Sequence, residues 1–330
     1  EGPLTFPSEF AHLTQASITI DEFAAENWQF KKQGTDLVLS AANHYFNETV
    51  IIPANTKLII KAGATLHMGD DVSILSYSPV AMIGTETSPI TVQAQNASKP
   101  WGSIAILNTE KSTSTIVHAK LSGGSEVSIQ GVQFSGMLAL HNADGIISHS
   151  SFTDVRGEDG INIKGGLVLI TDSSISNTLS DGLDIDYIDE NSIIKNNAFT
   201  NIGGDGIDMS WTNASITHNE IEVCTDKGIS VGERSITILD KNIITQCSTA
   251  IAVKDQSQAV IIENTIFDNK TAMSLYQKKP YFGGAHATAT NNILWQNRND
   301  IFTDSLSTIS LTNNSTTTPV SLDTLNKLSE

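Results

Sequence analysis

Three consecutive stretches of the chain each place acidic side chains beside a glycine. They read Asp181-Gly-Leu-Asp184-Ile-Asp186, Asp205-Gly-Ile-Asp208-Met-Ser and Asp226-Lys227-Gly-Ile-Ser-Val-Gly-Glu233-Arg234. If each stretch is a β-strand, alternate side chains share one face, so Asp184 and Asp186 point to the same side. Carboxylates this close repel one another unless a cation, a shared proton or a basic side chain compensates. Since no basic residue lies in the same coils, we predict that Asp184, Asp186 and Asp208 bind calcium, which accepts several carboxylate oxygens in flexible geometry.

Basic and aromatic side chains follow these carboxylates along the chain. Their order along the chain predicts a groove that runs from Asp184 past Asp208 and Lys227 to Lys254 and Tyr276. We expect an acidic oligosaccharide to lie in this groove, parallel to the long axis of the molecule. The candidate catalytic residues are Lys227, Asp205, Asp208 and Asp181. The candidate substrate-binding residues are Arg234, Glu233, Lys254, Tyr276, Lys278, Tyr281 and His286.

Several of these residues also have a purely structural interpretation. Asp159, Asp181 and Asp205 each precede a glycine, and Asp-Gly is common in turns because Asp bonds its own backbone and Gly permits the bend. Glu233 and Arg234 can equally form a solvated ion pair. The three carboxylates inside the strands favour a function more strongly, because acidic residues are depleted in strands. The segment from Tyr276 to His286 lengthens one coil by about six residues, and such insertions in solenoids are usually binding loops.

A repeat defines the elements that must position these side chains. Asparagines recur at intervals of 22, 23, 22 and 28 residues, at Asn197, Asn219, Asn242, Asn264 and Asn292. A period near 22 indicates stacked coils. We expect the asparagine column to form a ladder of amides that bond to one another and to the backbone, because Asn both donates and accepts.

A second column lies half a coil earlier and begins with Gly160-Ile-Asn-Ile, Gly182-Leu-Asp-Ile and Gly206-Ile-Asp-Met. Alternation along these strands sorts the residues into two sets. Stacked inside we expect Ile161, Leu183, Ile207, Ile229, Ile251 and Met273, and facing solvent we expect Asn162, Asp184, Asp208 and Ser230.

The repeat predicts an all-β fold, a right-handed parallel β-helix. Its organisation is an N-terminal cap over residues 1–35, a β-helix over 36–315 and a C-terminal tail over 316–330. The cap is expected because residues 5–30 have a helical texture and the terminal repeat of a solenoid must be covered. Length adds coils rather than thickening the core, so 330 residues fit in one solenoid.

Composition and charge exclude some partners. The net charge of −17 disfavours DNA, RNA and anionic membranes, and the sequence contains no apolar run long enough to insert into a bilayer. We expect a monomer that is secreted or on the cell surface, with any leader removed before Glu1. Cys224 and Cys247 are one coil apart and should be neighbours, either as a disulfide or as two buried thiols.

The short strands, asparagine turns and coil length resemble the pectate-lyase-like superfamily over roughly residues 40–315. Within it, polygalacturonase-type glycoside hydrolases carry Asn-Thr-Asp, Gly-Asp-Asp, Gly-His-Gly and Arg-Ile-Lys on successive coils. The matching stretches are Leu179-Ser-Asp181, Gly203-Gly-Asp205, Asp226-Lys-Gly228 and Ala252-Val-Lys254. Asp181, Asp205 and Lys254 are retained, while Gly204, Lys227 and Ala252 replace Asp, His and Arg. This resemblance implies hydrolysis by a pair of carboxyl groups.

The chain also resembles β-helical polysaccharide lyases of the chondroitinase B and alginate lyase type. In that family calcium neutralises the uronate and a Lys–Arg pair transfers the proton, which implies this role for Lys227, assisted by Arg234 or Lys254. Three classes of function follow. They are an enzyme that cleaves a uronic-acid-containing polysaccharide by elimination or hydrolysis, a non-catalytic polysaccharide-binding or adhesive protein, and a structural spacer. A spacer should not cluster charged and aromatic side chains on one face.

Overall fold

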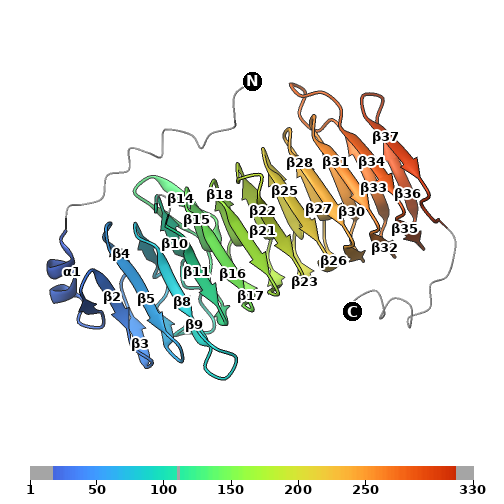
Figure 1. Ribbon diagram of the computed structural model, residues 1–330. Coiled ribbons are helices and arrows are strands. Elements are labelled where there is room, and N and C mark those ends of the chain that lie inside the picture. Colours follow the sequence, from blue (N-terminus) through green and yellow to red (C-terminus); the bar gives the residue numbers. More distant parts are fainter. Residues whose placement is uncertain (1–17, 110–111, 317–330) are drawn as a thin grey trace.

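The chain winds into a long stack of short β-strands in the computed structural model, which describes residues 18–109 and 112–316 (Figure 1). Each coil contributes strands to long sheets that run along the stack. Sheet A consists of β1 (Lys31–Gln33), β2 (Asp36–Leu39), β5 (Lys57–Lys61), β8 (Val80–Ile83), β11 (Ser114–Val117), β16 (Gly145–Ser148), β19 (Val168–Thr171), β22 (Ser192–Lys195), β25 (Asn213–Thr217), β28 (Ile236–Asp240), β31 (Gln258–Ile262), β34 (His286–Thr290) and β37 (Thr308–Thr312). Apart from the antiparallel β1–β2 pair, its strands are parallel.

The other two long sheets are parallel throughout their described strands. Sheet B consists of β3 (Asn43–Phe46), β6 (Thr65–Met68), β9 (Ile90–Ala94), β12 (Ala119–Ser122), β17 (Ser151–Val155), β20 (Ser174–Thr178), β23 (Ala198–Ile202), β26 (Glu220–Cys224), β29 (Ile243–Thr245), β32 (Thr265–Phe267) and β35 (Ile293–Trp295). Sheet C consists of β4 (Val50–Ile52), β7 (Ile74–Ser76), β10 (Ile104–Leu107), β15 (Gly136–His141), β18 (Asp159–Lys164), β21 (Asp181–Asp186), β24 (Ile207–Ser210), β27 (Lys227–Gly232), β30 (Thr249–Lys254), β33 (Thr271–Tyr276) and β36 (Asn299–Thr303).

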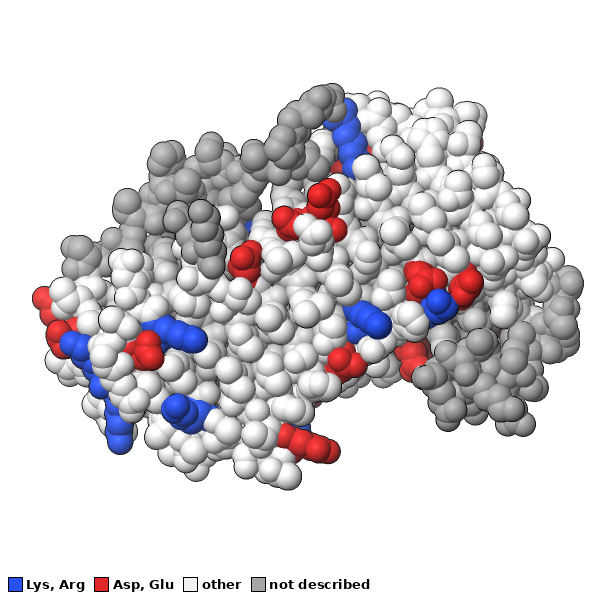
Figure 2. Space-filling view, viewed as in Figure 1, with Lys and Arg blue, Asp and Glu red and all other residues white. Residues whose placement is uncertain are grey.

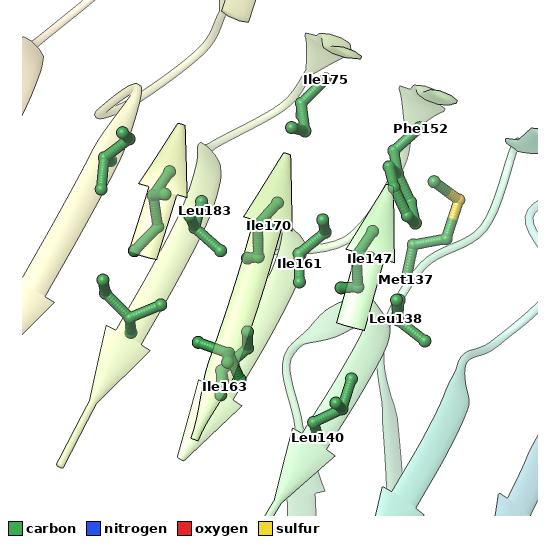
Figure 3. Close-up of a cluster of buried hydrophobic side chains, with 14 of the residues drawn as sticks. Met137, Leu138, Leu140, Ile147, Phe152, Ile161, Ile163, Ile170, Ile175 and Leu183 are labelled. Carbon is green, nitrogen blue, oxygen red and sulfur yellow. The ribbon is translucent and has the colours of Figure 1, made fainter. Parts of the chain in front are cut away.

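The inward column predicted from the repeat is confirmed. Ile207, Ile229 and Ile251 are direct register partners on β24, β27 and β30, and each is 0% exposed. Figure 3 shows that side chains from all three sheets point into one shared core, with Ile161 from sheet C, Ile170 from sheet A and Ile175 from sheet B. Because each coil packs on its neighbours through such columns, the core extends along the stack.

The predicted asparagine ladder is also confirmed, at the tight turn between sheets A and B. Asn219 Nδ2 donates to Asn242 Oδ1 and to the carbonyl of Ile194, both at 3.0 Å. The backbone N–H of Asn219 donates to the same Asn242 oxygen at 3.0 Å. The pattern repeats from Asn197 to Asn314, so the ladder satisfies buried backbone groups in each coil that it crosses.

The first coil is covered by α1 (Ile20–Glu26). Thr19 caps this helix in a capping box with Glu22, and Phe23 packs against Phe30 with ring centroids 5.2 Å apart. Phe30 in turn contacts Phe46 of β3 at 5.8 Å. The rest of the predicted cap, residues 1–17, and the tail residues 317–330 lie outside the described residues.

A small antiparallel hairpin covers the outer face of sheet C near its N-terminal end. Its strands are β13 (Val127–Ile129) and β14 (Val132–Phe134). Val132 and Phe134 form an apolar cluster with Leu75, Ala105 and Ala139, which lie on β7, β10 and β15. The strands that carry the acidic side chains, from β18 onward, lie beyond this cluster.

The two cysteines are free, buried thiols rather than a disulfide. Cys224 and Cys247 lie on neighbouring coils as expected, and a hydrogen bond between them together with burial raises the pKa of Cys224. Figure 2 shows Lys, Arg, Asp and Glu on one face of the molecule as separate small groups with uncharged surface between them. None of the helices in the described part of the chain is long and apolar enough to cross a membrane.

Candidate functional site

Sheet C aligns the predicted polar column along its outer face. Asn162 of β18 pairs with Asp184 of β21, which pairs with Asp208 of β24, and this residue pairs with Ser230 of β27. The orientation is therefore as predicted. Their exposure differs from the prediction, because Asn162 and Ser230 are 0% exposed. Part of the column is therefore buried rather than open to solvent.

Three carboxyl groups converge beside this column. Asp181, Asp205 and Asp208 each place one oxygen so that all three oxygens lie within 4.8 Å of one another. Asp181 Oδ1 accepts the backbone N–H of Asp205 at 2.7 Å. Gly204 makes room for this arrangement, since a Cβ atom there would lie 2.1 Å from Asp181 Oδ1. The converging set shares only Asp208 with the predicted calcium ligands Asp184, Asp186 and Asp208.

Lysines from neighbouring coils pair with the carboxylates, which the sequence interpretation had left without basic partners. Lys164 Nζ lies 3.5 Å from Asp186, and Lys254 Nζ lies 3.5 Å from Asp208. Lys227 Nζ lies 3.2 Å from Asp205 Oδ1 and also contacts Asp226. Alternation along one strand did not reveal the pairs of Lys164 with Asp186, Lys254 with Asp208 and Lys227 with Asp205, because each of these connects different coils.

Burial raises the pKa of several carboxyl groups of this site. It raises the pKa of Asp181 to about 6, with a further contribution from the neighbouring Asp205 and Asp208. Burial likewise raises the pKa of Asp186 to about 6 against the opposing effect of Lys164. The pKa of Asp184 lies well above its ordinary value because the group is buried beside Asp186. The site can therefore hold both protonated and ionised carboxyl groups near neutral pH.

The environment of Lys227 favours its charged form. Burial lowers the pKa of Lys227, but the adjacent Asp205 and Asp226 raise it more, so it lies above its ordinary value. Lys227 is itself only 7% exposed. The ammonium group is thus held as a positive charge at the start of β27.

An aromatic ladder lies at the ends of the sheet C strands. Tyr187 follows β21 and stacks on Trp211, which follows β24, with ring planes 6° apart and centroids separated by 6.2 Å. The guanidinium group of Arg234 lies 5.6 Å from the Trp211 ring centroid and 5.7 Å from that of Phe282. The sequence patterns did not identify Tyr187, Trp211 and Phe282 as site residues. Tyr187 and Trp211 are one coil apart and each directly follows an outward-facing polar residue, which is the signal that would have found them.

The inserted segment after β33 folds against this ladder, with Phe282 packed edge-on to Trp211. Asp255 Oδ1 accepts the backbone N–H groups of Lys278 and Lys279, at 2.7 and 2.8 Å. Lys279 forms an ion pair with Glu233. Tyr281 is 76% exposed at the surface of this segment.

Two other predicted substrate-binding residues lie at different places. Tyr276 ends β33 and is the register partner of Lys254, so it belongs to sheet C as expected. His286 begins β34 of sheet A, and its Nδ1 lies 2.8 Å from Thr308 Oγ1. The structure does not bring His286 to the carboxyl groups, because the chain has already turned from sheet C to sheet A at that point.

A buried series of hydrogen-bonded side chains also reaches Asp184 from the N-terminal side of the site. His141 Nε2 lies 2.6 Å from Asn162 Oδ1, and Asn162 Nδ2 donates to Asp184 Oδ2 at 2.7 Å. Burial lowers the pKa of His141 to about 4, so the imidazole is neutral at physiological pH. Phe134 of the hairpin packs on the imidazole at 4.7 Å. No periodic signal indicates this series of side chains in the sequence, since β15 belongs to the less regular coils.

A separate concavity of about 700 Å³ lies over the asparagine ladder, between sheets A and B. Side chains of mixed charge line it, including Lys120, His149, Asp172, His218 and Lys241. Size alone would favour it as the site. The converging carboxyl groups and the carboxyl groups with raised pKa values lie on the outer face of sheet C instead, and we place the candidate site there on that chemistry.

Comparison with known proteins confirms the fold. Residues 159–316 match the family model described as the right handed beta helix region, which includes the candidate site. The fold is thus a right-handed parallel β-helix. No curated protein is detectably similar in sequence.

Solved structures with the same fold have little sequence identity to this chain. A double mutant of the periplasmic alginate epimerase AlgG is 13% identical with a TM-score of 0.63, covering 91% of this chain and 84% of that one. The Dettilon tailspike protein is 13% identical with a TM-score of 0.63, covering 82% of this chain and 62% of that one. The catalytic unit of the GH87 α-1,3-glucanase from Streptomyces thermodiastaticus is 12% identical with a TM-score of 0.52, covering 84% and 63%. At these identities the likeness extends to the fold alone.

Proposed function

We propose that the chain is a carbohydrate-active enzyme that hydrolyses a uronic-acid-containing polysaccharide bound along the outer face of sheet C. The observation that carries this proposal is the convergence of Asp181, Asp205 and Asp208, whose oxygens lie within 4.8 Å of one another on that face. Carboxyl groups in pairs are the usual machinery of glycoside hydrolysis.

The three carboxyl groups have different environments, and these suggest different chemical roles. Hydrolysis needs one protonated carboxyl group as general acid and one ionised carboxylate. Asp181, with its pKa raised to about 6 by burial, is our general acid. Asp208, which lies 3.5 Å from the Lys254 ammonium group, is the second carboxyl group of the pair. Asp205 is paired with Lys227 and positions both neighbours.

The state of Lys227 favours hydrolysis over elimination. A lyase needs an unprotonated base to remove the proton beside the uronate. Asp205 and Asp226 hold Lys227 in its charged form, so we assign Lys227 the role of a fixed positive charge. Among the predicted catalytic residues, the carboxyl groups then remain as the proton-transferring groups.

The cations along the face support an acidic substrate. Lys164, Lys227, Lys254 and Lys279 all lie among the groove carboxylates, and ammonium groups attract the carboxylates of a polyuronate. The names of two proteins with this fold, an alginate epimerase and an α-1,3-glucanase, point to polysaccharides as well. The epimerase is described as periplasmic, which supports our expectation of a location outside the cytoplasm.

A polymer screen tests the proposal. We expect new reducing ends from at least one uronic-acid polymer, without the absorbance of an unsaturated product. Asp181→Asn and Asp208→Asn should each lower the rate by about 100-fold to 10,000-fold, the usual contribution of a general acid or base. Asp172→Asn is the matched control, because Asp172 is exposed over the asparagine ladder and its side chain accepts a hydrogen bond from Asn196 alone among the contacts seen. Full activity in the Asp181 and Asp208 variants would contradict the assignment.

Other outcomes of the same screen identify the alternatives. An unsaturated product that is lost in Lys227→Ala would establish elimination with Lys227 as the proton-transferring group. Binding of a polymer without any product would establish a non-catalytic polysaccharide-binding protein. The aromatic ladder of Tyr187, Trp211 and Phe282 gives that alternative a physical basis, since aromatic side chains are common in carbohydrate-binding surfaces.

A calcium ion is the second candidate for the groove, because three carboxyl oxygens within 4.8 Å suit a divalent cation. If calcium binds, Asp181, Asp205 and Asp208 are its ligands and a chelator abolishes activity. If the carboxyl groups act directly, a chelator has no effect. We favour direct action because Lys227 and Lys254 already supply two positive charges to Asp205 and Asp208.

A further inference from the structure

The segment between β33 and β34, residues 277–285, is here called the insert, and hydrogen bonds hold it at both ends. At its start, Asp304 Oδ2 accepts the backbone N–H of Gln277 at 2.8 Å. Near its end, the carbonyl of Gly283 accepts the backbone N–H of Gln256 at 3.2 Å. The insert is therefore attached to the coils on both sides of it.

A buried carboxylate fixes the middle of the insert. Asp255 is 0% exposed, and its Oδ1 atom accepts the backbone N–H groups of Lys278 and Lys279 at 2.7 and 2.8 Å. Hydrogen bonds to an ionised acceptor are stronger than those between neutral groups. Because Asp255 is fully buried, it cannot touch a ligand at the surface, and its contribution is to hold the insert in one conformation.

Two aromatic side chains of the insert differ sharply in exposure. Phe282 is 9% exposed and packs edge-on against Trp211, with ring centroids 5.6 Å apart. Tyr281 is 76% exposed, and its ring centroid lies 4.9 Å from that of Phe282. Phe282 thus supports Tyr281 from within, while Tyr281 remains open to solvent. A ring that is already held in place loses little conformational entropy when a ligand stacks on it.

The insert is basic, although the protein as a whole is acidic. Its nine residues include two lysines and no acidic residue, whereas the net charge of the chain is −17. Lys278 is exposed, and the side chain of Lys279 keeps 39% exposure beside Glu233. Glu233, and to a smaller extent Tyr281 and Asp255, raise the pKa of Lys279 against the effect of burial. An open aromatic ring beside ammonium groups suits a sugar that carries a carboxylate.

We propose that the insert is a preformed outer subsite for an acidic polysaccharide, in which Tyr281 stacks on a uronate ring and the neighbouring lysines attract its carboxylate. The inference rests on the proposed function for the class of ligand, and it assigns the binding of one sugar unit to residues away from the converging carboxyl groups.

Contacts between side chains fix the insert relative to β24. Lys279 pairs with Glu233, and the Ser210 hydroxyl donates to Glu233 as well. Ser210 ends β24 two residues after Asp208, and Trp211 follows directly. Asp208 and Trp211 are thus separated by about 10 Å along an extended chain, at about 3.3 Å per residue. A sugar at the insert, which lies beyond Trp211, is therefore a different unit of the polymer from the sugar at the carboxyl groups.

Tyr281→Ala and Tyr281→Phe test the stacking contact by affinity gel electrophoresis. The probes are alginate and polygalacturonate, which are uronic-acid polymers, and dextran, which is neutral. All proteins in this series carry Asp181→Asn, so that a cleavable probe is not consumed. At least one acidic polymer should slow the protein with Tyr281 intact. Tyr281→Ala should weaken this binding by about 3-fold to 10-fold, the range expected for an aromatic contact, and Tyr281→Phe should retain it.

Tyr45→Ala is the matched control, because Tyr45 is 54% exposed on β3 of sheet B and also stacks on a neighbouring ring, that of His67, at 4.5 Å. It should leave the affinity unchanged. Equal affinities of the Tyr281→Ala and Tyr281→Phe proteins, or no binding to either acidic polymer, would overturn the inference. Equally strong binding of dextran would overturn the assignment of a uronate.

Hydrogen exchange of the free wild-type protein tests whether the subsite is preformed. The backbone amides of Lys278 and Lys279 should be protected, because both donate to Asp255. Asp255→Ala should release these amides and weaken polymer binding, although Asp255 itself is fully buried. Exchange as fast as in an unstructured peptide would refute preformation, and the wild-type measurement does not depend on the folding of any variant.

Kinetics separate this inference from the proposed function. If a polymer is cleaved, Tyr281→Ala in the otherwise unchanged protein should raise KM and leave kcat unaltered, because Tyr281 holds a sugar that does not react. A lower kcat with unchanged KM would contradict this role. Binding that depends on Tyr281 without any cleavage would refute the proposed function and leave the subsite standing. Cleavage with polymer binding that is independent of Tyr281 would refute the subsite and leave the proposed function standing.

Discussion

Replacing Ile229 with Ala tests the core that supports the site. Ile229 is 0% exposed on β27 and is stacked between Ile207 and Ile251 in the inward column of sheet C. We expect the variant to fold and to lose stability. Ile229→Asp should not fold, because a carboxylate in this column would be buried without a partner.

The magnitude follows from what the substitution removes. Ile→Ala deletes three carbon atoms, worth roughly 2.4 kcal/mol at about 0.8 kcal/mol for each buried methylene. A cavity then remains, because the ladder hydrogen bonds fix the spacing of β24, β27 and β30 and prevent the coils from closing it. The total loss should lie in the upper part of the range of about 2–5 kcal/mol measured for such substitutions.

Urea denaturation followed by circular dichroism measures this loss as a change in the free energy of unfolding. Ile238→Ala is the matched control. It is the same substitution on β28 of sheet A, where the side chain is 46% exposed, and it should cost less than about 1 kcal/mol. Equal losses for the two variants, or a soluble and equally stable Ile229→Asp protein, would refute the assigned register.

Three further predictions concern charge and thiol chemistry. Burial raises the pKa of Asp159 to about 8, so the folded state binds more protons than the unfolded state between about pH 4 and 8 and stability falls as the pH rises through this window. Asp159→Asn should remove this pH dependence. In urea titrations, the free energy of unfolding of the variant relative to the wild type should be higher at pH 8 than at pH 4 by at least about 1 kcal/mol. Calorimetric titration with calcium should give little heat in the wild type if lysines neutralise the converging carboxyl groups. Strong binding that is lost in Asp208→Ala but not in Asp184→Ala would instead establish the converging carboxyl groups as the calcium site. Cys224 and Cys247 should react with a thiol reagent only after unfolding, and rapid labelling of the folded protein would contradict their burial.

The period of the chain was sufficient to predict the fold. In a parallel stack, residues one coil apart become register partners, so a recurring Ile or Asn in the sequence is a column in space. The ladder from Asn197 to Asn314 and the column through Ile229 follow directly. Strand alternation also predicted that Asp184 and Asp208 are adjacent on the outer face.

The partners of the site residues could not be predicted in this way. Long side chains reach across coils, and their final direction depends on space that other residues leave open. Lys254 reaches Asp208 past Gly232, where a Cβ atom would lie 2.6 Å from Lys254 Cε, and Gly204 likewise leaves room for the carboxyl group of Asp181. The placement of His286 on sheet A depended on where the inserted segment turns, which the sequence does not encode as a period.

The sequence by itself therefore determined the coil, its register and the face on which the acidic residues lie. These properties repeat, and a repeat is visible in one dimension. The tertiary structure decided which carboxyl groups converge, which lysines neutralise them and how Tyr187 and Trp211 stack beside them. Those contacts depend on burial and on distances between side chains of different coils, and neither is a periodic property of the chain.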